Sequence, residues 1–420
     1  MGGFSYRNHE LFCEEVKIQE IAEDIGTPFY LYNYDIIVGN YQRFIEAFKE
    51  FSPLICYAYK ANSNLAICKV LASKGCGADI FSGGELFKAR KAGVPPDKIV
   101  FNGNGKTRQE IEYALEENIL MFNVDQRDEL LLLNELAKKK EKVARISVRV
   151  NPQIDPKTHP YVATGLANSK FGLSFHQAEE VYRLATELKN IHILGIHTHI
   201  GSQITKTGPY LETLKMLNEI ISRLEKTGIE IRYLNLGGGF GIAYREETVP
   251  SPQEFATMLS PYINRDYRLI LEPGRAIVGN AGILVTKVLY VKNTPSKTFI
   301  VVDCAMNDLI RPALYNSFHR ILPVNNKGSE KDKTFLVDIV GPICEDGDFL
   351  GKDRRLPALR PGDLLAILDT GAYGYAMSSN YNLRLRVSEV MVIKDRYYTI
   401  RESETYEDLI AKEIIPEEME

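Results

Sequence analysis

Lys60 is the residue whose setting first suggests covalent chemistry. It ends the apolar stretch LICYAYK, residues 54–60, and the polar turn ANSN follows directly. A lysine in this position either extends along the surface with its amine in solvent, or lies buried, where the amine can act as a nucleophile. A nucleophilic amine forms Schiff bases with carbonyl groups. The choice depends on which other groups the fold brings beside Lys60.

Two glycine-containing segments could bind a phosphate group. NLGGGFG, residues 235–241, has three consecutive glycines after an apolar stretch, and these expose backbone N–H groups with no side chain in the way. LEPGR, residues 271–275, places Glu272 after another apolar stretch and follows it with Pro-Gly and Arg275. The alternatives are a plain tight loop for the first segment and a structural ion pair of Glu272 with Arg275 for the second.

IHTHIGSQ, residues 196–203, carries two histidines that would lie on one face of a strand. Such a pair could bind zinc, but a zinc site needs further ligands from later strands, and only His319 follows residue 199. We therefore expect no metal. We expect His199 to be a neutral imidazole stacked on an aromatic ligand, Ser202 to reach a phosphate, and His197 to be a core histidine with its hydrogen bonds satisfied.

An amine, a phosphate-binding turn and a carboxylate describe a site for pyridoxal phosphate. Lys60 would form the Schiff base, the glycines at 237–239 would hold the phosphate, and Glu272 would keep the pyridine nitrogen protonated, so that the ring accepts electrons. These segments are far apart in the sequence, so the fold must bring them to one place.

Eight short, β-rich apolar stretches are the predicted strands that position these residues. They are LICYAYK (54–60), CGADIF (76–81), KIVFNG (98–103), ILMFNV (119–124), RISVRV (145–150), ILGIHTHI (193–200), YLNLGG (233–238) and RLILEP (268–273). Amphipathic stretches lie between them, including GGELFKARKAG and a long helical pattern at 210–228 that stops at Gly228. Continuous apolar strands that alternate with helices indicate a parallel sheet covered on both faces.

The number of strands favours an α/β fold of the (β/α)8 TIM-like barrel type. An open, doubly wound sheet is the alternative, and its first unit should carry G-x-G-x-x-G. GGGFGI at 237–242 fails that pattern because Ile242 stands at the final glycine position. In a barrel, catalytic side chains lie where the strands end. Those ends carry, in order, Lys60, Asp79, Asn102, Asp125, Arg149, His199, Gly237–Gly239 and Glu272.

The sequence pattern changes after about residue 280. Strand-like stretches such as AGILVTKVLYVKN, KTFIVVDC and DLLAILDTGAY follow one another with few helical gaps, which indicates a second, mostly antiparallel β domain. TPFYLYN at 27–33 is also strand-like, and we expect it to complete that domain. The predicted domains are therefore a cofactor-binding barrel at 35–278 and a β-sandwich-like domain of 1–34 plus 279–420. Residues 324–333 are predicted to form a polar loop.

Composition excludes several classes of partner. The net charge of −4 favours neither nucleic acid nor an anionic membrane surface. No window of about 20 residues is free of charge, so we expect no membrane span, and the first ten residues lack the apolar core of a signal peptide. The six cysteines are scattered without a C-x-x-C pair, which is typical of a reducing cytoplasm.

Six motifs in this order resemble those of the diaminopimelate decarboxylase family: YAYKAN, HIGSQ, LGGGFG, EPGR, GPICEDGD and GAYGYAMSSNYN. The resemblance runs from near the N-terminus to about residue 400. That family belongs to the alanine-racemase-like, fold-type III enzymes, which combine a barrel with a β domain. The resemblance implies pyridoxal phosphate-dependent decarboxylation of meso-2,6-diaminopimelate to L-lysine and CO2, the last step of lysine biosynthesis, in a homodimer with shared active sites.

The resemblance also implies roles for individual residues. Lys60 forms the Schiff base, His199 stacks on the cofactor ring, and Glu272 pairs with its nitrogen. The phosphate is held by Ser202, Gly238, Gly239, Gly274 and Arg275. Substrate is bound by Arg275, Arg311, Tyr315, Glu345 and Tyr373, the last of which also touches the cofactor. Cys344 of the partner subunit is the proton donor. Asp346 stands where the family commonly has serine, which alters the charge near the substrate amine.

Other functions remain open at this stage. Related decarboxylases act on arginine, ornithine or carboxynorspermidine. A racemase of the same fold lacks the thiol that GPICEDGD supplies, and a non-catalytic pyridoxal phosphate-binding protein of this kind is a barrel alone. A metal-dependent hydrolase would need more histidines. Taken alone, Cys344 could be a small buried hydrophobic residue, Arg311 part of a strand-end ion pair and Tyr373 a core residue.

Overall fold

The computed structural model describes residues 3–155, 164–165, 169–326 and 334–419. Most of the predicted polar loop at 324–333 therefore lies outside the described residues. The chain divides into two compact units, residues 38–277 and residues 1–37 with 278–420. We call them the barrel unit and the β unit. The chain passes between them within α2 (Tyr34–Ala47) and at the end of α10 (Arg275–Val278).

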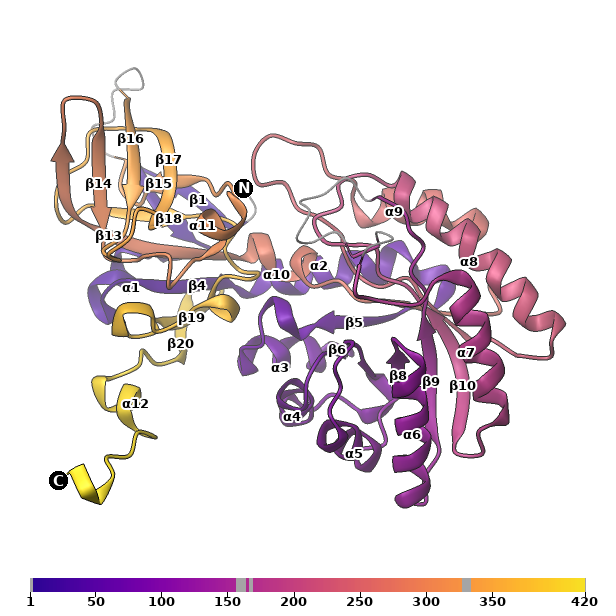
Figure 1. The fold of residues 1–420 in the computed structure, drawn as a ribbon. Coiled ribbons are helices and arrows are strands. Elements are labelled where there is room, and N and C mark those ends of the chain that lie inside the picture. Colours follow the sequence, from indigo (N-terminus) through magenta and orange to yellow (C-terminus); the bar gives the residue numbers. More distant parts are fainter. Residues whose placement is uncertain (1–2, 156–163, 166–168, 327–333, 420) are drawn as a thin grey trace. The chain divides into compact units, whose positions relative to one another are not determined.

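The barrel unit contains a closed barrel of eight parallel strands (Figure 1). The strands are β5 (Leu54–Ala58), β6 (Gly77–Ile80), β7 (Ile99–Phe101), β8 (Met121–Val124), β9 (Ala144–Arg149), β10 (Ile191–His197), β11 (Tyr233–Asn235) and β12 (Arg268–Leu271). β12 pairs with β5 and closes the barrel. All eight predicted strands are present, so the barrel is confirmed and the open sheet is excluded.

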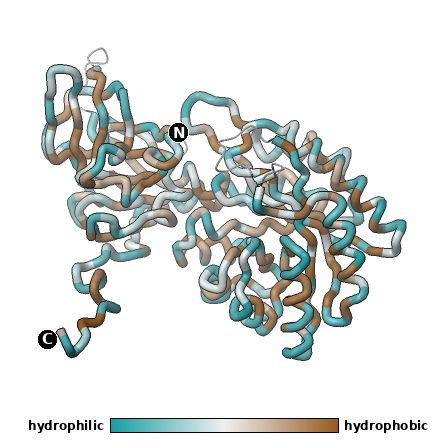
Figure 2. The backbone as a smooth tube through the Cα atoms, viewed as in Figure 1, coloured by the Kyte–Doolittle hydropathy of each residue, from teal (hydrophilic) through white to brown (hydrophobic). Residues whose placement is uncertain are grey.

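Helices connect the barrel strands and surround them (Figure 1). They are α3 (Leu65–Ser73), α4 (Gly83–Ala92), α5 (Arg108–Glu116), α6 (Arg127–Lys139), α7 (Phe175–Glu187), α8 (Gly208–Lys226) and α9 (Pro252–Leu259). Their apolar positions recur at helical spacing, so each buries one face and exposes the other, and Figure 2 shows hydrophobic and hydrophilic segments alternating along them. α8 ends before Gly228, whose φ of +84° is a left-handed conformation that glycine adopts at little cost.

The barrel interior is apolar where the strands begin and polar where they end. Leu54, Cys56, Val100, Met121 and Ile270 form a buried cluster toward the beginnings of their strands. Burying one such leucine or isoleucine stabilises the fold by about 1.5–3 kcal/mol. This layer supports the polar side chains at the carboxyl ends of the strands.

The β unit is built on a nine-stranded, mostly antiparallel sheet. Its strands are β4 (Phe29–Asn33), β13 (Gly282–Asn293), β14 (Thr298–Val302), β15 (Ile321–Pro323), β16 (Phe335–Val340), β17 (Phe349–Leu356), β18 (Leu364–Ile367), β19 (Ser388–Ile393) and β20 (Arg396–Arg401). β4 lies antiparallel to β13 and parallel to β19, so the early strand completes this sheet, as predicted.

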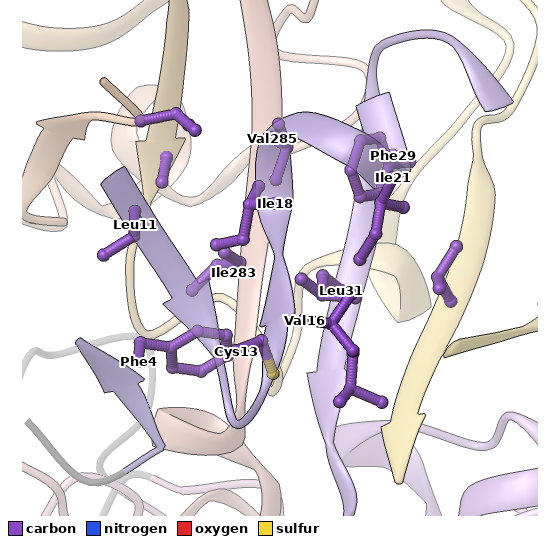
Figure 3. Close-up of a cluster of buried hydrophobic side chains, with 14 of the residues drawn as sticks. Phe4, Leu11, Cys13, Val16, Ile18, Ile21, Phe29, Leu31, Ile283 and Val285 are labelled. Carbon is purple, nitrogen blue, oxygen red and sulfur yellow. The ribbon is translucent and has the colours of Figure 1, made fainter. Parts of the chain in front are cut away.

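The β unit also contains smaller elements. They are β1 (Phe4–Arg7), β2 (Glu10–Cys13), β3 (Val16–Lys17), α1 (Ile18–Ile25), α11 (Arg311–Tyr315) and α12 (Tyr406–Ile410). Figure 3 shows the buried cluster in which β1, β2, β3 and α1 meet β4 and β13, with Phe4, Leu11, Ile21, Phe29 and Ile283 in contact within it. The N-terminal segment is therefore part of the core of the β unit.

Candidate functional site

The carboxyl ends of the barrel strands carry the predicted site residues of the barrel unit. Lys60 lies in the 3-10 turn at Tyr59–Ala61, directly after β5, and its side chain is half-buried. Its Nζ lies 3.9 Å from the centroid of the Phe81 ring, a cation–π contact. Its charge also influences Asp79, which lies at the end of the neighbouring β6, and His199, which follows β10. The amine therefore lies among the groups of the barrel rim.

Glu272 follows β12 and is held by three side chains. Its Oε1 accepts hydrogen bonds from Asn235 Nδ2 at 2.7 Å and Asn102 Nδ2 at 2.9 Å, and its Oε2 lies 3.3 Å from His197 Nε2. Burial alone would raise the pKa of Glu272, but His197 and the hydrogen bonds from Asn235 and Asn102 outweigh burial, so the pKa lies below its ordinary value. Glu272 is thus a buried, ionised carboxylate.

Asp79, at the end of β6, is a second buried carboxyl close to Glu272. Its Oδ1 accepts a hydrogen bond from Asn102 Nδ2 at 2.7 Å. Burial and the negative charge of Glu272 raise the pKa of Asp79 well above its ordinary value, although Lys60 opposes them. The two carboxyls therefore differ in acidity: the pKa of Glu272 is lowered and that of Asp79 is raised.

His199 is a half-buried, neutral imidazole. Burial, together with the positive charges of Lys60 and Arg149, lowers its pKa well below the ordinary value. The backbone N–H of Gly238 donates to His199 Nδ1 at 3.1 Å, so the ring proton is on Nε2. Gly238 thereby orients the ring, and a neutral ring suits stacking on an aromatic ligand.

The three glycines after β11 stand where neighbouring backbone atoms leave no room for a side chain. A Cβ atom on Gly238 would lie 2.1 Å from the carbonyl oxygen of Glu272, and one on Gly239 would lie 2.3 Å from that of Gly201. The backbone N–H groups of Gly239 and Phe240 donate no hydrogen bond to any part of the chain that the structure describes. This turn can therefore offer two amides to an anion.

The segment after β12 approaches both the lysine turn and Ser202. A Cβ on Gly274 would lie 3.0 Å from the Cβ atoms of Ala58 and Ala61, which flank the Lys60 turn. Arg275 Nη2 donates to Ser202 Oγ at 3.2 Å, and Arg275 Nη1 donates to the Tyr244 hydroxyl at 2.5 Å. The structure thus brings Ser202 and Arg275 together and adds Tyr244 to them.

His197 corrects one expectation. It was expected to be a core histidine with its hydrogen bonds satisfied, but its Nδ1 has no partner among the described residues and its Nε2 faces Glu272. Burial lowers its pKa, so the neutral ring donates from Nε2. Asn102 is predicted only to stand at a strand end, and Asn235 is not among the predicted site residues, although both lie in predicted strands, at 98–103 and 233–238.

Five predicted site residues lie in the β unit and are described within it. Cys344 is exposed, and its N–H donates to Asn382 Oδ1 at 3.1 Å. The Tyr381 hydroxyl donates to Glu345 Oε2 at 2.9 Å. The carboxylate of Asp348 accepts the N–H groups of Ile343 and Met306, both at 2.7 Å. Hydrogen bonds to Asp348 within the GPICEDGD loop, and to Asn382 and Tyr381 outside it, therefore fix the conformation of this loop. The alternative expectation that Cys344 is a small buried hydrophobic residue is wrong, because Cys344 is exposed.

The other three predicted site residues of the β unit are Arg311, Tyr315 and Tyr373. Arg311 is buried at the start of α11, where its Nη1 lies 3.2 Å from His319 Nε2 and its Nη2 donates to Ser317 Oγ at 3.3 Å. Tyr315 is half-buried at the end of the same helix. Tyr373 has a φ of +57°, an uncommon conformation for a non-glycine residue that often marks functional sites.

The barrel rim fits pyridoxal phosphate. An amine at Lys60 can bind its aldehyde, an ionised Glu272 can pair with its ring nitrogen, and a neutral His199 can stack on the ring. The free amides of Gly239 and Phe240 suit its phosphate. Among the described residues, no three His, Cys, Asp or Glu side chains are grouped to hold a metal ion, and no helix is long and apolar enough to cross a membrane.

The comparisons with known proteins agree on one family. The model for the pyridoxal binding domain of pyridoxal-dependent decarboxylases matches residues 35–279. Diaminopimelate decarboxylase of Aquifex aeolicus is 49% identical over 407 residues, which cover 96% of each chain.

Two solved structures are also similar over nearly their whole length. Diaminopimelate decarboxylase from Methanocaldococcus jannaschii in co-complex with L-lysine has a TM-score of 0.95 at 41% identity, covering 100% of this chain and 99% of that one. The Helicobacter pylori enzyme complexed with L-lysine has a TM-score of 0.90 at 41% identity, covering 94% and 98%. The chain therefore belongs to the diaminopimelate decarboxylase family of pyridoxal-dependent decarboxylases.

Proposed function

We propose that this protein converts meso-2,6-diaminopimelate to L-lysine and CO2 with pyridoxal phosphate as cofactor. The observation that carries the proposal is the buried, ionised Glu272, held by Asn102, Asn235 and His197 on the rim that also bears Lys60. Relatives that are 44–49% identical over nearly the full length are diaminopimelate decarboxylases, and two solved relatives hold L-lysine, the product named here.

In this proposal each rim residue has a defined task. When bound, pyridoxal phosphate accepts the electron pair left behind as the carboxylate departs as CO2. Lys60 holds the aldehyde carbon and yields it to the substrate amine. Glu272 holds a proton at the ring nitrogen, and His199 covers one ring face. Ser202, Arg275 and the turns at Gly238–Gly239 and Gly274 hold the phosphate.

The residues of the β unit would bind substrate and complete the reaction. Arg311 and Tyr315, with Arg275, supply donors for the distal carboxylate, Glu345 accepts from the distal ammonium, and Tyr373 contacts both cofactor and substrate. Cys344 of the partner subunit delivers a proton to the α-carbon, a step that suits a thiol. The protein would therefore be a homodimer with two shared sites.

Two further parts of the proposal concern organisation. The functional domains would be residues 35–278, and 1–34 with 279–420 as a β-sandwich-like domain, and these boundaries stay predictions. We also propose a cytoplasmic location. All six cysteines are free thiols, which suits a reducing compartment.

The proposed reaction is tested by incubating the purified protein and pyridoxal phosphate with meso-diaminopimelate, and measuring lysine and CO2. Ornithine, arginine and carboxynorspermidine are assayed in parallel. We expect lysine and CO2 in equal amounts and little turnover of the other three, because each leaves buried polar groups of the distal pocket unpaired. Comparable turnover of ornithine would contradict the substrate assignment.

Replacing Gly238 with alanine should disrupt the rim without removing a functional side chain. The new Cβ would lie 2.1 Å from the Glu272 carbonyl oxygen, so the end of β12 must move and carry the carboxylate with it. We expect turnover about 100-fold lower, because small displacements of catalytic groups have effects of this size. Gly105→Ala is the control, since its Cβ meets open space. Equal cofactor affinity and turnover in both variants would refute the prediction.

Mixing two inactive variants tests whether the sites are shared. Lys60→Ala and Cys344→Ala protomers are inactive alone, but a mixed dimer would keep one intact site. About half of the dimers are mixed after random exchange, so roughly a quarter of the wild-type activity should return. Lys60→Ala mixed with Glu272→Gln is the control, because both changes lie in the barrel unit and no intact site can form. Absence of rescue after confirmed exchange would place each site within one chain.

A further inference from the structure

A series of buried side chains, joined by hydrogen bonds, extends from β9 across β8 to the carboxyl groups of Asp79 and Glu272. The hydroxyl of Ser147 on β9 donates to Asn123 Oδ1 on β8. Asn123 Nδ2 donates to Asn102 Oδ1 at 2.8 Å, just beyond β7. Asn102 Nδ2 then donates to Asp79 Oδ1 at 2.7 Å and to Glu272 Oε1 at 2.9 Å. We call Ser147, Asn123 and Asn102 the amide chain; each is at most 1% exposed.

The donors and acceptors of the amide chain can be arranged in one order only. An ionised Glu272 accepts hydrogen bonds and donates none, so Asn102 must turn its NH2 group toward the carboxyls. Its oxygen then faces Asn123, which must also present its NH2 group. The side-chain oxygen of Asn123 then accepts the hydrogen bond from the Ser147 hydroxyl. Every donor therefore points toward Glu272 and Asp79, and the ionised Glu272 determines the orientation of Asn102 and, through it, that of Asn123.

One amide thus contacts two carboxyl groups that repel each other when both are ionised. Glu272 has two further partners, Asn235 and His197, which stabilise its charge. Asp79 faces the negative charges of Glu272 and Glu85 and the positive charge of Lys60. The unequal number of donors assigns the negative charge to Glu272 and the proton to Asp79. The opposite pKa directions of the two groups agree with this assignment.

Asn102 donates one hydrogen bond to each carboxyl and so does not distinguish between them. We propose that Asn235, whose amide donates to Glu272 and not to Asp79, is a positioning residue that keeps the single negative charge of this carboxyl pair on Glu272 and the proton on Asp79. Without Asn235 the proton would be shared more evenly between the two groups. The catalytic consequence rests on the proposed function, because a partly protonated Glu272 would hold the proton of the cofactor ring nitrogen less firmly. The location of the proton does not depend on the substrate.

Isotope-edited infrared spectroscopy locates the proton directly. In protein labelled with 13C at aspartate carboxyls, we expect a protonated-carboxyl band in apoenzyme and holoenzyme that is absent from Asp79→Asn. The measurement belongs at about pH 8, because burial raises the pKa of Asp308 to about 7, and Asp308 is ionised at that pH. An Asp79 that is ionised at this pH would overturn the proposal.

The holoenzyme supplies a second readout, the 15N chemical shift of bound, ring-labelled pyridoxal phosphate. Asn235→Leu should shift the ring nitrogen toward its unprotonated form and lower kcat about 10- to 100-fold with little change in KM, as expected on losing a residue that orients a catalytic group. The double variant Asn235→Leu/Asp79→Asn should recover most of the protonated ring signal, because the competing acid is gone. A merely structural Asn235 would show no such recovery, and that outcome would refute the proposal.

Two controls keep the outcomes distinct. Asn102→Leu removes one donor from each carboxyl and leaves the difference between them unchanged, so Asp79→Asn should not rescue it. If Asn235→Leu does not fold, His197→Phe takes its place, since it removes the other donor that Glu272 has and Asp79 lacks, and the same rescue is expected. If diaminopimelate proves not to be the substrate, the infrared and 15N results still decide the proposal.

Discussion

Replacing Lys60 with alanine will lower turnover by roughly 10⁴-fold or more, the loss expected when a covalent catalytic group is removed. No other amine occupies this position, and the Lys60 ammonium lies over Phe81 among Asp79 and His199 rather than in solvent. The variant should keep its fold, because a half-buried side chain in a 3-10 turn is lost without leaving a large cavity.

Three measurements check this prediction. The visible absorbance of the holoenzyme should disappear in Lys60→Ala. Borohydride reduction of the wild type, followed by peptide mapping, should place the cofactor mass on the peptide that contains residue 60. Lys91→Ala is the matched control, since that amine also lies over a phenyl ring, 5.6 Å from the centroid of Phe87, but on the exposed surface of α4. Cofactor mass on another lysine would defeat the assignment of the nucleophile.

Replacing Glu272 with glutamine should lower kcat by about 10²- to 10⁴-fold, the range for losing a charge or proton-holding group in a buried site. Glutamine has nearly the same shape but no negative charge, so the ring nitrogen loses the partner that holds its proton. Its NH2 group would also face Asn102, Asn235 or His197, all of which present donors. KM should change much less than kcat, because the proposed partner of Glu272 is the cofactor ring and not the substrate.

The ring 15N shift and the steady-state constants distinguish this outcome from a folding defect. Glu272→Gln should bind pyridoxal phosphate with an unprotonated ring nitrogen. Glu254→Gln serves as the control, because Glu254 is an exposed capping residue of α9 and its replacement affects only local helix stability. A Glu272→Gln enzyme with wild-type kcat and a protonated ring nitrogen would remove Glu272 from the mechanism.

The barrel could be predicted because its signal is local. Each strand is a short apolar run, and each helix has apolar residues at three- or four-residue spacing, so neighbouring residues alone reveal both. The observed strands end up to three residues before their predicted ends, as β10 does at His197 rather than at residue 200. The polar residue that follows a strand lies in a loop, where the backbone no longer pairs with the sheet.

The short strands of the β unit were not predicted. β3 has two residues and β15 has three, too few for an alternation of apolar and polar residues to show. They form because other segments provide partners: β3 pairs with the adjacent β2, and β15 with β18. The pairing of β15 with β18 joins segments distant in the sequence, which no local window contains.

The sequence by itself determined which residue types stand at the strand ends, including Lys60, Glu272 and the glycines at 237–239, because a strand end is a local feature. Only the tertiary structure decided their charge states and partners. One amide, Asn102, reaches both Asp79 and Glu272 because closure of the barrel brings β12 beside β5 and so near β6 and β7. Burial and hydrogen bonding then select which carboxyl keeps the proton, and both are properties of the assembled barrel.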